Sequence, residues 1–266
     1  MNSAILFIGA GRMAEAIISG LHKNNQQKFK RVFVTNRSNP SRLQTLSDMY
    51  GVQPVREWSE VIKEVSVVVL AIPPQEHEKI LNKLKGVVTD QFIVTIAAGI
   101  GPSFIEARLP GNQAVGWIMP NTAAELGHSI SLYTYGKYVT EANKNQMVEL
   151  VDSIGASQLC TEKEIHDLTA VTGSAPAFLY LFVEGLIEIT EKYGVSKEVS
   201  QKLVTEMVVG SAEMLRTGKT PNELREQVTT PGGATAEGIA LLKNGGFEKL
   251  LQEAIKATNK KANGSI

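Results

Sequence analysis

The chain has 266 residues, of which 43% are hydrophobic and 20% charged, a composition that supports a sizeable core, and its length favours two domains. Lysine plus arginine and aspartate plus glutamate are equal at 27 each, so no charge excess points to nucleic acid or an anionic membrane as a partner. The single cysteine, Cys160, excludes an internal disulfide and favours a reducing cytoplasm, while four scattered histidines without metal-ligand spacing predict no metal site.

The first 160 residues alternate short apolar runs with helical patterns. Strand-length runs rich in β-branched residues occupy 4–9, 31–35, 66–72 and 92–98, with further runs at 114–119 and 129–136. Apolar residues recur every three or four positions in 12–23, 39–51 and 74–86, and a further helix is expected near 140–154. Runs that are apolar at nearly every position suit a parallel sheet covered on both faces. The alternation therefore predicts a doubly wound α/β domain over residues 1–161.

After about residue 161 the pattern becomes helical, with no convincing strand over 162–266. Apolar residues surround most of the segment 177–189, which predicts a helix buried on several sides. Glutamates interrupt this segment too often for a membrane span. Met207 and Met214 fall at helical spacing and are expected in a core. A domain this small has little interior, so we expect a second subunit to cover the helix.

A glycine-rich turn follows the first predicted strand. Gly9, Gly11 and Ala14 form G-x-G-x-x-A at the start of the first predicted helix. The first glycine allows a tight turn, the second lets the backbone approach a pyrophosphate, and the alanine permits close packing of helix on strand. Such turns also occur without ligands, but a position on the first strand of an α/β pattern favours dinucleotide binding.

The end of the second predicted strand indicates which dinucleotide binds. The strand ends with Thr35, Asn36 and Arg37, and no carboxylate is present to accept bonds from the ribose hydroxyls of NADH. A fixed positive charge suits a ribose 2′-phosphate, although a solvated surface arginine is the usual alternative. We therefore expect NADPH as the cofactor, with NADH binding more weakly.

Seven stretches in this order make the chain similar to the pyrroline-5-carboxylate reductase family: FIGAGRMAEAI, TNR, AIPPQ, TIAAGI, MPNT, AVTGSAPAFLY and VTTPGGATAEGI. The resemblance runs over nearly the whole chain. It implies an N-terminal Rossmann-like doubly wound sheet and a C-terminal all-helical dimerisation domain. It also implies reduction of 1-pyrroline-5-carboxylate, a cyclic imine carboxylate, to L-proline with a nicotinamide cofactor, for which the end of the second strand favours NADPH.

The resemblance implies a set of site residues. The cofactor contacts are Ile8, Gly9, Ala10, Gly11, Arg12, Met13, Thr35, Asn36, Arg37, Ala71, Ile72, Pro73, Pro74, Ala97, Ala98, Gly99 and Asn121. The substrate carboxylate would lie on Gly232, Gly233, Ala234 and Thr235 at a helix start, where anions are stabilised. Thr235 would be the catalytic side chain, orienting the imine nitrogen; a helix cap is the alternative for this hydroxyl.

The chain departs from the usual family pattern at several positions. Pro73 replaces a lysine, Trp58 stands where an asparagine often touches the adenosine, and Trp117 lies upstream of MPNT where an arginine is common. These changes leave two alternatives open: a related cyclic imine reductase, or a non-catalytic NADP-binding regulatory paralogue. Assembly as a homodimer or a higher homo-oligomer is expected, with no nucleic-acid or membrane partner.

Two polar sites resemble catalytic groups, but their sequence contexts do not favour a catalytic role. His166 and Asp167 are adjacent, and neighbours on a helix do not face each other, so a charged first turn is expected rather than a catalytic pair. Cys160 has no cation beside it to lower the pKa of its thiol and is expected to be inert.

Overall fold

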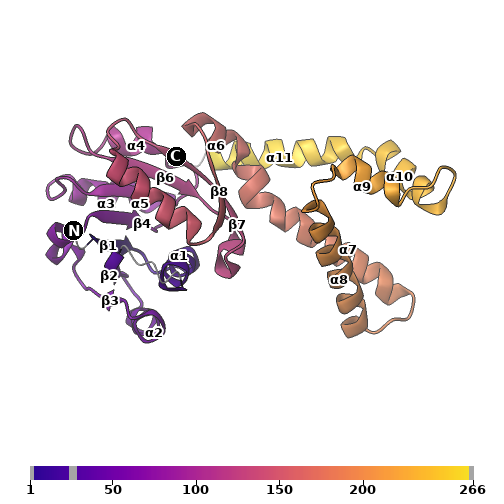
Figure 1. Cartoon of the computed structure of the whole chain (residues 1–266), viewed down its shortest axis with the longest axis horizontal. Coiled ribbons are helices and arrows are strands. Elements are labelled where there is room, and N and C mark those ends of the chain that lie inside the picture. The colour runs from indigo at the N-terminus through magenta and orange to yellow at the C-terminus, as the bar shows by residue number, and fades with distance from the viewer. Residues whose placement is uncertain (1–2, 24–28, 264–266) are drawn as a thin grey trace. The chain divides into compact units, whose positions relative to one another are not determined.

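The computed structural model describes residues 3–23 and 29–263, and within these residues eight strands form one sheet in the order β3-β2-β1-β4-β5-β6-β7-β8 (Figure 1). The strands are β1 (Ser3–Ile8), β2 (Phe29–Thr35), β3 (Gln53–Pro54), β4 (Val67–Leu70), β5 (Phe92–Thr95), β6 (Val115–Met119), β7 (Ser129–Tyr135) and β8 (Gly155–Leu159). Every pairing is parallel except that of β6 with β7. The doubly wound sheet predicted from the apolar runs is confirmed.

Helices cover both faces of this sheet. They are α1 (Arg12–Lys23), α2 (Pro40–Tyr50), α3 (His77–Leu84), α4 (Pro102–Glu106), α5 (Glu141–Asp152) and α6 (Glu162–Thr169). One buried cluster joins α1, α2 and α5 to one face, and a second joins α3 and α4 to the other. All four residues of β4 and of β5 are buried, as a strand between two helical layers requires.

Local signals determine where several helices begin and end. The Asn39 side chain accepts a hydrogen bond from the Arg42 N–H at 3.0 Å, and Pro40 occupies the first helical position of α2. Gly51 ends that helix with φ +66°, a left-handed conformation that glycine adopts without strain. The helix predicted over 12–23 has those bounds in the structure.

The chain divides into two compact units. The first, which we call the sheet unit, runs to Gly173 and includes the chain from Asn259 onward; the second, the helical unit, is Ser174–Thr258. The boundary predicted from sequence lies earlier, between residues 161 and 162. The difference arises because α6 belongs to the sheet unit: Ile165 is fully buried with Trp117 and Leu132 of the sheet.

The helical unit contains helices and no strand among the residues that the structure describes. The helices are α7 (Ala175–Lys192), α8 (Lys197–Leu215), α9 (Pro221–Gln227), α10 (Ala234–Asn244) and α11 (Phe247–Asn263), the last of which continues into the sheet unit. The predicted all-helical region is thereby confirmed. α7 and α8 pack against each other as a hairpin.

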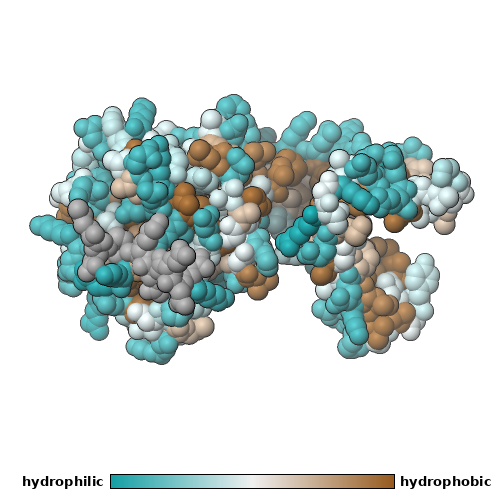
Figure 2. Space-filling view, viewed as in Figure 1, coloured by the Kyte–Doolittle hydropathy of each residue, from teal (hydrophilic) through white to brown (hydrophobic). Residues whose placement is uncertain are grey.

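Apolar side chains are exposed over the α7–α8 hairpin of the single chain, where Figure 2 shows a concentration of hydrophobic surface. No residue of α7 is buried, and Ser200 and Val204 are the buried residues of α8. The prediction that Met207 and Met214 lie in a core is wrong for the single chain, because their exposures are 47% and 44%. Among the described residues, one helical run, Glu162–Lys192, is long and apolar enough to cross a membrane.

Candidate active site

The glycine-rich turn lies between β1 and α1. Different structural features explain why glycine occupies its two positions, 9 and 11. Gly9 has φ +114°, and a Cβ there would lie 2.1 Å from the Ala71 carbonyl oxygen, so only glycine fits. A Cβ at Gly11 would meet no atom within 4 Å. Contacts within the chain therefore give no reason for glycine at position 11, whereas the close approach of a ligand to the backbone does.

The turn opens onto a groove at the carboxyl ends of β1, β2 and β4. Strand order reverses between β1 and β4, and ligands of doubly wound sheets bind outside the strand ends at such a point. We call this the strand-end groove; its lining is Ile8, Gly9, Ala10, Gly11, Thr35, Asn36, Arg37, Ser38, Arg56, Glu57, Trp58, Ala71, Ile72, Pro73, Glu76, Lys79, Ile80 and Lys83.

Most of the predicted cofactor residues at the ends of β1, β2 and β4 line the strand-end groove. Those that line it are Ile8, Gly9, Ala10, Gly11, Thr35, Asn36, Arg37, Ala71, Ile72 and Pro73. The predicted residues outside its lining are Arg12, Met13, Pro74, Ala97, Ala98, Gly99 and Asn121. Arg12 and Met13 begin α1, Pro74 begins the turn before α3, and the others follow β5 and β6.

At the end of β2 the polar side chains are engaged locally. The buried Thr35 hydroxyl donates to the Arg56 carbonyl at 3.4 Å, and Asn36 Oδ1 accepts from the Ser38 N–H at 3.2 Å. The Arg37 side chain is 76% exposed, and its guanidinium lies 3.3 Å from a Glu76 carboxylate oxygen. A pair this exposed contributes little to stability, so Arg37 is available to a phosphate at small cost.

Three further cations, Arg56, Lys79 and Lys83, line the groove and were not predicted. Lys79 and Lys83 are four positions apart on α3, a spacing that puts both on one side of the helix and could have indicated them. The described lining also includes the carboxylates of Glu57 and Glu76. The groove thus has positive charge close to the predicted 2′-phosphate position, although Pro73 stands where the resemblance implies a lysine.

The residues after β5 form a second, separately supported loop. The Ala97 carbonyl accepts a hydrogen bond from Trp117 Nε1 at 2.9 Å, and Trp117 is fully buried. Gly99 has φ +79°, which glycine allows without strain. The Trp117 side chain therefore supports the predicted nicotinamide loop by a hydrogen bond to the backbone of that loop. An arginine at this position would instead supply a charge.

Asn121 has its side chain committed to the fold. Its Oδ1 accepts from the Ala123 N–H at 3.0 Å and caps the turn Thr122–Leu126, while Nδ2 donates to the Thr172 carbonyl at 3.1 Å. The residue is 9% exposed. These bonds hold the segment that follows β6.

In the helical unit, residues 232–235 form the start of α10. Gly232 has φ +71°, and Gly233 is the N-cap residue, with no side-chain cap. Thr235 is exposed in the first turn, no side-chain hydrogen bond caps the helix, and within the described residues the Thr235 hydroxyl makes no hydrogen bond. The alternative that Thr235 caps the helix is therefore wrong. Unpaired N–H groups at a helix start stabilise anions.

The discounted polar residues have structural partners. His166 packs its ring on Trp117, with centroids 4.9 Å apart, while Asp167 pairs with Lys163, so the two adjacent side chains do not face each other. They lie in the last turn of α6 rather than the expected first turn, because α6 ends at Thr169. Burial and the nearby Glu164 carboxylate raise the pKa of the Cys160 thiol, which disfavours a reactive thiolate.

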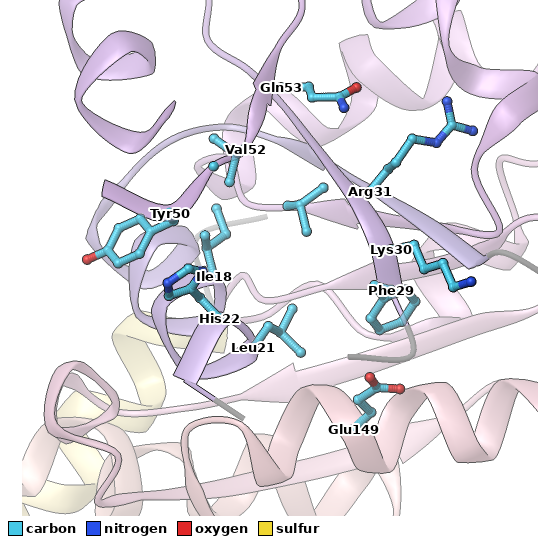
Figure 3. A pocket seen from close by; sticks show the side chains of 12 residues that line it. Ile18, Leu21, His22, Phe29, Lys30, Arg31, Tyr50, Val52, Gln53 and Glu149 are labelled. Carbon is cyan, nitrogen blue, oxygen red and sulfur yellow. The ribbon is translucent and has the colours of Figure 1, made fainter. Parts of the chain in front are cut away.

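A separate hollow lies at the amino end of β2, away from the carboxyl ends that form the strand-end groove (Figure 3). His22 from α1, Tyr50 from α2 and Glu149 from α5 line it, and the His22 and Tyr50 rings meet edge to face with centroids 5.9 Å apart. It contains none of the predicted site residues. We assign it no part in the candidate site.

Comparisons with known proteins agree on one family. A family model described as "Pyrroline-5-carboxylate reductase dimerisation" matches residues 162–265, and one described as "NADP oxidoreductase coenzyme F420-dependent" matches residues 4–99. Pyrroline-5-carboxylate reductase 1 of Bacillus subtilis (strain 168) is 35% identical over 260 residues, which cover 97% of this chain and 88% of the relative.

Solved structures give the same result. A pyrroline-5-carboxylate reductase from Coxiella burnetii superposes with a TM-score of 0.89 at 30% identity, covering 98% of each chain. The Plasmodium falciparum pyrroline carboxylate reductase, solved with NADP bound, has a TM-score of 0.87 at 26% identity and covers 98% of this chain and 97% of its own.

Proposed function

The chain belongs to the pyrroline-5-carboxylate reductase family, and from this premise we propose that it reduces 1-pyrroline-5-carboxylate to L-proline with NADPH, the last step of proline biosynthesis. The observation that carries the proposal is the similarity to such reductases over 97% of the chain. The strand-end groove, with its open Gly11 and its cations, supports a phosphate-bearing cofactor in this chain.

We assign NADPH to the strand-end groove. The N–H groups at the start of α1 stabilise its pyrophosphate, and Gly11 leaves room for the backbone to approach it. Arg37, Arg56 and Lys79 supply positive charge for the 2′-phosphate. Trp58, partly exposed in the same groove, offers a flat apolar face to the adenine where the family often has an asparagine.

In the proposed reaction, NADPH supplies the hydride that the carbon of the C=N bond accepts, and the nitrogen takes a proton from water. The protein then needs no strong general acid, and its contribution is chiefly to position the imine. The start of α10 holds the substrate carboxylate on the N–H groups of Ala234 and Thr235, with Gly232 and Gly233 shaping the turn. The free Thr235 hydroxyl orients the imine nitrogen by a hydrogen bond.

We further propose that the protein is a homodimer that works in the cytoplasm. The unburied apolar residues of α7, within the segment that matches a dimerisation model, support coverage by a second copy rather than by a membrane. Glu184 and Glu188 interrupt that surface. One cysteine and no internal disulfide suit a reducing compartment.

A turnover assay tests the proposal. Purified protein with NADPH and 1-pyrroline-5-carboxylate should consume NADPH, followed by its absorbance, at rates ordinary for an enzyme, roughly 1–1000 per second. Faster turnover of a six-membered cyclic imine carboxylate would instead identify a related imine reductase. NADPH binding without turnover of either imine would indicate the regulatory paralogue.

A further inference from the structure

A buried histidine lies beneath the loop that follows β4. His77 is the first residue of α3 and Thr95 the last of β5, and both have 0% exposure. His77 Nδ1 lies 3.1 Å from the Pro73 carbonyl oxygen, and His77 Nε2 lies 3.0 Å from Thr95 Oγ1. Neither His77 nor Thr95 belongs to the predicted contact residues, and the proposed reaction does not use them.

The partners determine which ring nitrogen carries the proton. A carbonyl oxygen can only accept, so His77 Nδ1 must donate to Pro73. Nε2 of the neutral ring then has a free lone pair and accepts from the Thr95 hydroxyl. Burial lowers the pKa of His77, which favours the neutral ring that this arrangement requires.

The chain of bonds continues to the loop that follows β5. Thr95 Oγ1 accepts a hydrogen bond from the Ala97 N–H at 3.2 Å, and the Ala97 carbonyl accepts from buried Trp117 at 2.9 Å. Pro73, His77, Thr95 and Ala97 thus form one connected set, which we call the His77 relay. It joins the loop after β4 to the loop after β5.

We infer that His77 is a positioning residue that holds these two loops at a fixed separation before NADPH binds. The inference rests on the proposed function, which assigns Pro73 and Ala97 to the cofactor site. A site whose loops are already ordered binds more tightly, because less conformational entropy is lost on binding. The charged neighbours face elsewhere: Glu76 pairs with Arg37, and Glu78 is exposed.

Substitutions at the two side chains test the relay through NADPH affinity, measured by the fluorescence of the bound cofactor. His77→Leu and Thr95→Val should each raise the Kd for NADPH by about 5- to 30-fold, the effect of losing one or two neutral hydrogen bonds. Thr95→Ser keeps the hydroxyl and should restore near-normal affinity. The double variant His77→Leu/Thr95→Val should have a Kd for NADPH no higher than that of whichever single variant binds NADPH more weakly, because both substitutions break the same connection.

Gln91→Leu is the matched control for loss of a buried hydrogen bond. Gln91 is 2% exposed and donates to the Ile62 carbonyl at 3.0 Å, at the amino end of β5 rather than the carboxyl end. This variant should lower the Tm and leave the Kd for NADPH unchanged. If His77→Leu and Thr95→Val behave in the same way as Gln91→Leu, His77 is merely structural and the inference is overturned.

The protein without cofactor provides a second readout. Nitrogen NMR of labelled histidine should show His77 with Nδ1 protonated and Nε2 unprotonated, and Thr95→Val should shift the Nε2 signal. The tautomer can be assigned in the unaltered protein, so this measurement remains possible even if a substitution prevents folding. A proton on Nε2 would overturn the relay, whereas absence of NADPH binding by the unaltered protein would overturn the proposed function.

Discussion

The sheet unit and the helical unit differ in how much surface a single chain buries. Every residue of β4 and β5 is buried between two layers of helices. In the helical unit no residue of α7, α9 or α10 is buried, although α7 is the most apolar helix of the chain. The sheet unit thus supplies its own core, whereas the helical unit leaves its apolar side chains exposed in the single chain, where the proposed dimer would cover them. The stability of the two units should therefore respond differently to protein concentration.

The largest effect is expected from charges on α7. Leu179 and Phe182 are three positions apart on one side of the helix, with exposures of 48% and 50% in the single chain. The double change Leu179→Glu/Phe182→Glu should weaken the proposed dimer by about 3–6 kcal/mol, since full burial of such a side chain contributes roughly 1.5–3 kcal/mol and the dimer buries about half of each one in each of two subunits. Sedimentation equilibrium measures the shift toward monomer.

Glu191→Gln, near the end of the same helix, is the control and should leave the dimer intact. Hydrogen exchange sharpens the comparison: in the charged variant the amides of α7 should exchange faster, while those of β4 and β5 keep their protection. A monodisperse, active monomer of the unaltered protein at micromolar concentration would contradict the difference between the units.

A second prediction concerns the sheet unit and its glycine-rich turn. Gly9→Ala should destabilise the protein by about 2–5 kcal/mol, combining left-handed strain with a clash against the Ala71 carbonyl. Gly11→Ala meets no protein atom and should cost less than about 1 kcal/mol while weakening NADPH. Thermal unfolding and cofactor titration separate the two. A Gly11→Ala variant with unaltered NADPH affinity would show that no ligand approaches the backbone there.

The third prediction concerns the start of α10 in the helical unit. Thr235→Val retains the shape and removes the hydroxyl, so kcat/KM should fall by roughly 10–1000-fold, the range for losing a preorganised donor. NADPH affinity should not change, because the cofactor groove belongs to the sheet unit. An unaltered kcat/KM would show that the Thr235 hydroxyl takes no part in the reaction.

Thr220→Val is the matched control for that change. Thr220 caps α9, and its hydroxyl and N–H form a reciprocal pair with the Glu223 side chain and N–H. Its loss should cost about 0.5–2 kcal/mol of stability and leave kcat/KM unchanged.

The smallest effect is expected at Arg37 in the strand-end groove. Arg37→Ala should weaken NADPH by about 1.5–3 kcal/mol, the range for a hydrogen bond to a charged group, and leave NADH nearly unchanged. Glu76→Gln frees Arg37 from its exposed pair and should not weaken NADPH. Equal losses for both cofactors would make Arg37 structural. The effects of the Arg37 and Glu76 variants on cofactor affinity should not depend on protein concentration, whereas the effect of the α7 variant should.

The sequence by itself determined most elements of the sheet unit and the glycine-rich turn. The helix over 12–23 has the predicted bounds, and the six predicted apolar runs became β1, β2 and β4 to β7, because periodicity and glycine conformation are properties of neighbouring residues. The strands β3 and β8, which contain no buried residue and therefore no apolar run, were not among the predicted runs. The different needs of Gly9 and Gly11 were also readable, because the motif specifies one tight turn and one open approach.

Only the tertiary structure decided which distant residues share a site. Arg56 and Lys79 line the same groove as Gly11 because the strand order places β1 between β2 and β4. His77, one of four scattered histidines in the sequence, is buried against Thr95 through the pairing of β4 with β5. Met207, expected in a core, is exposed in the single chain. Local pattern specifies an element and its apolar face, but pairing between distant segments decides what that face meets.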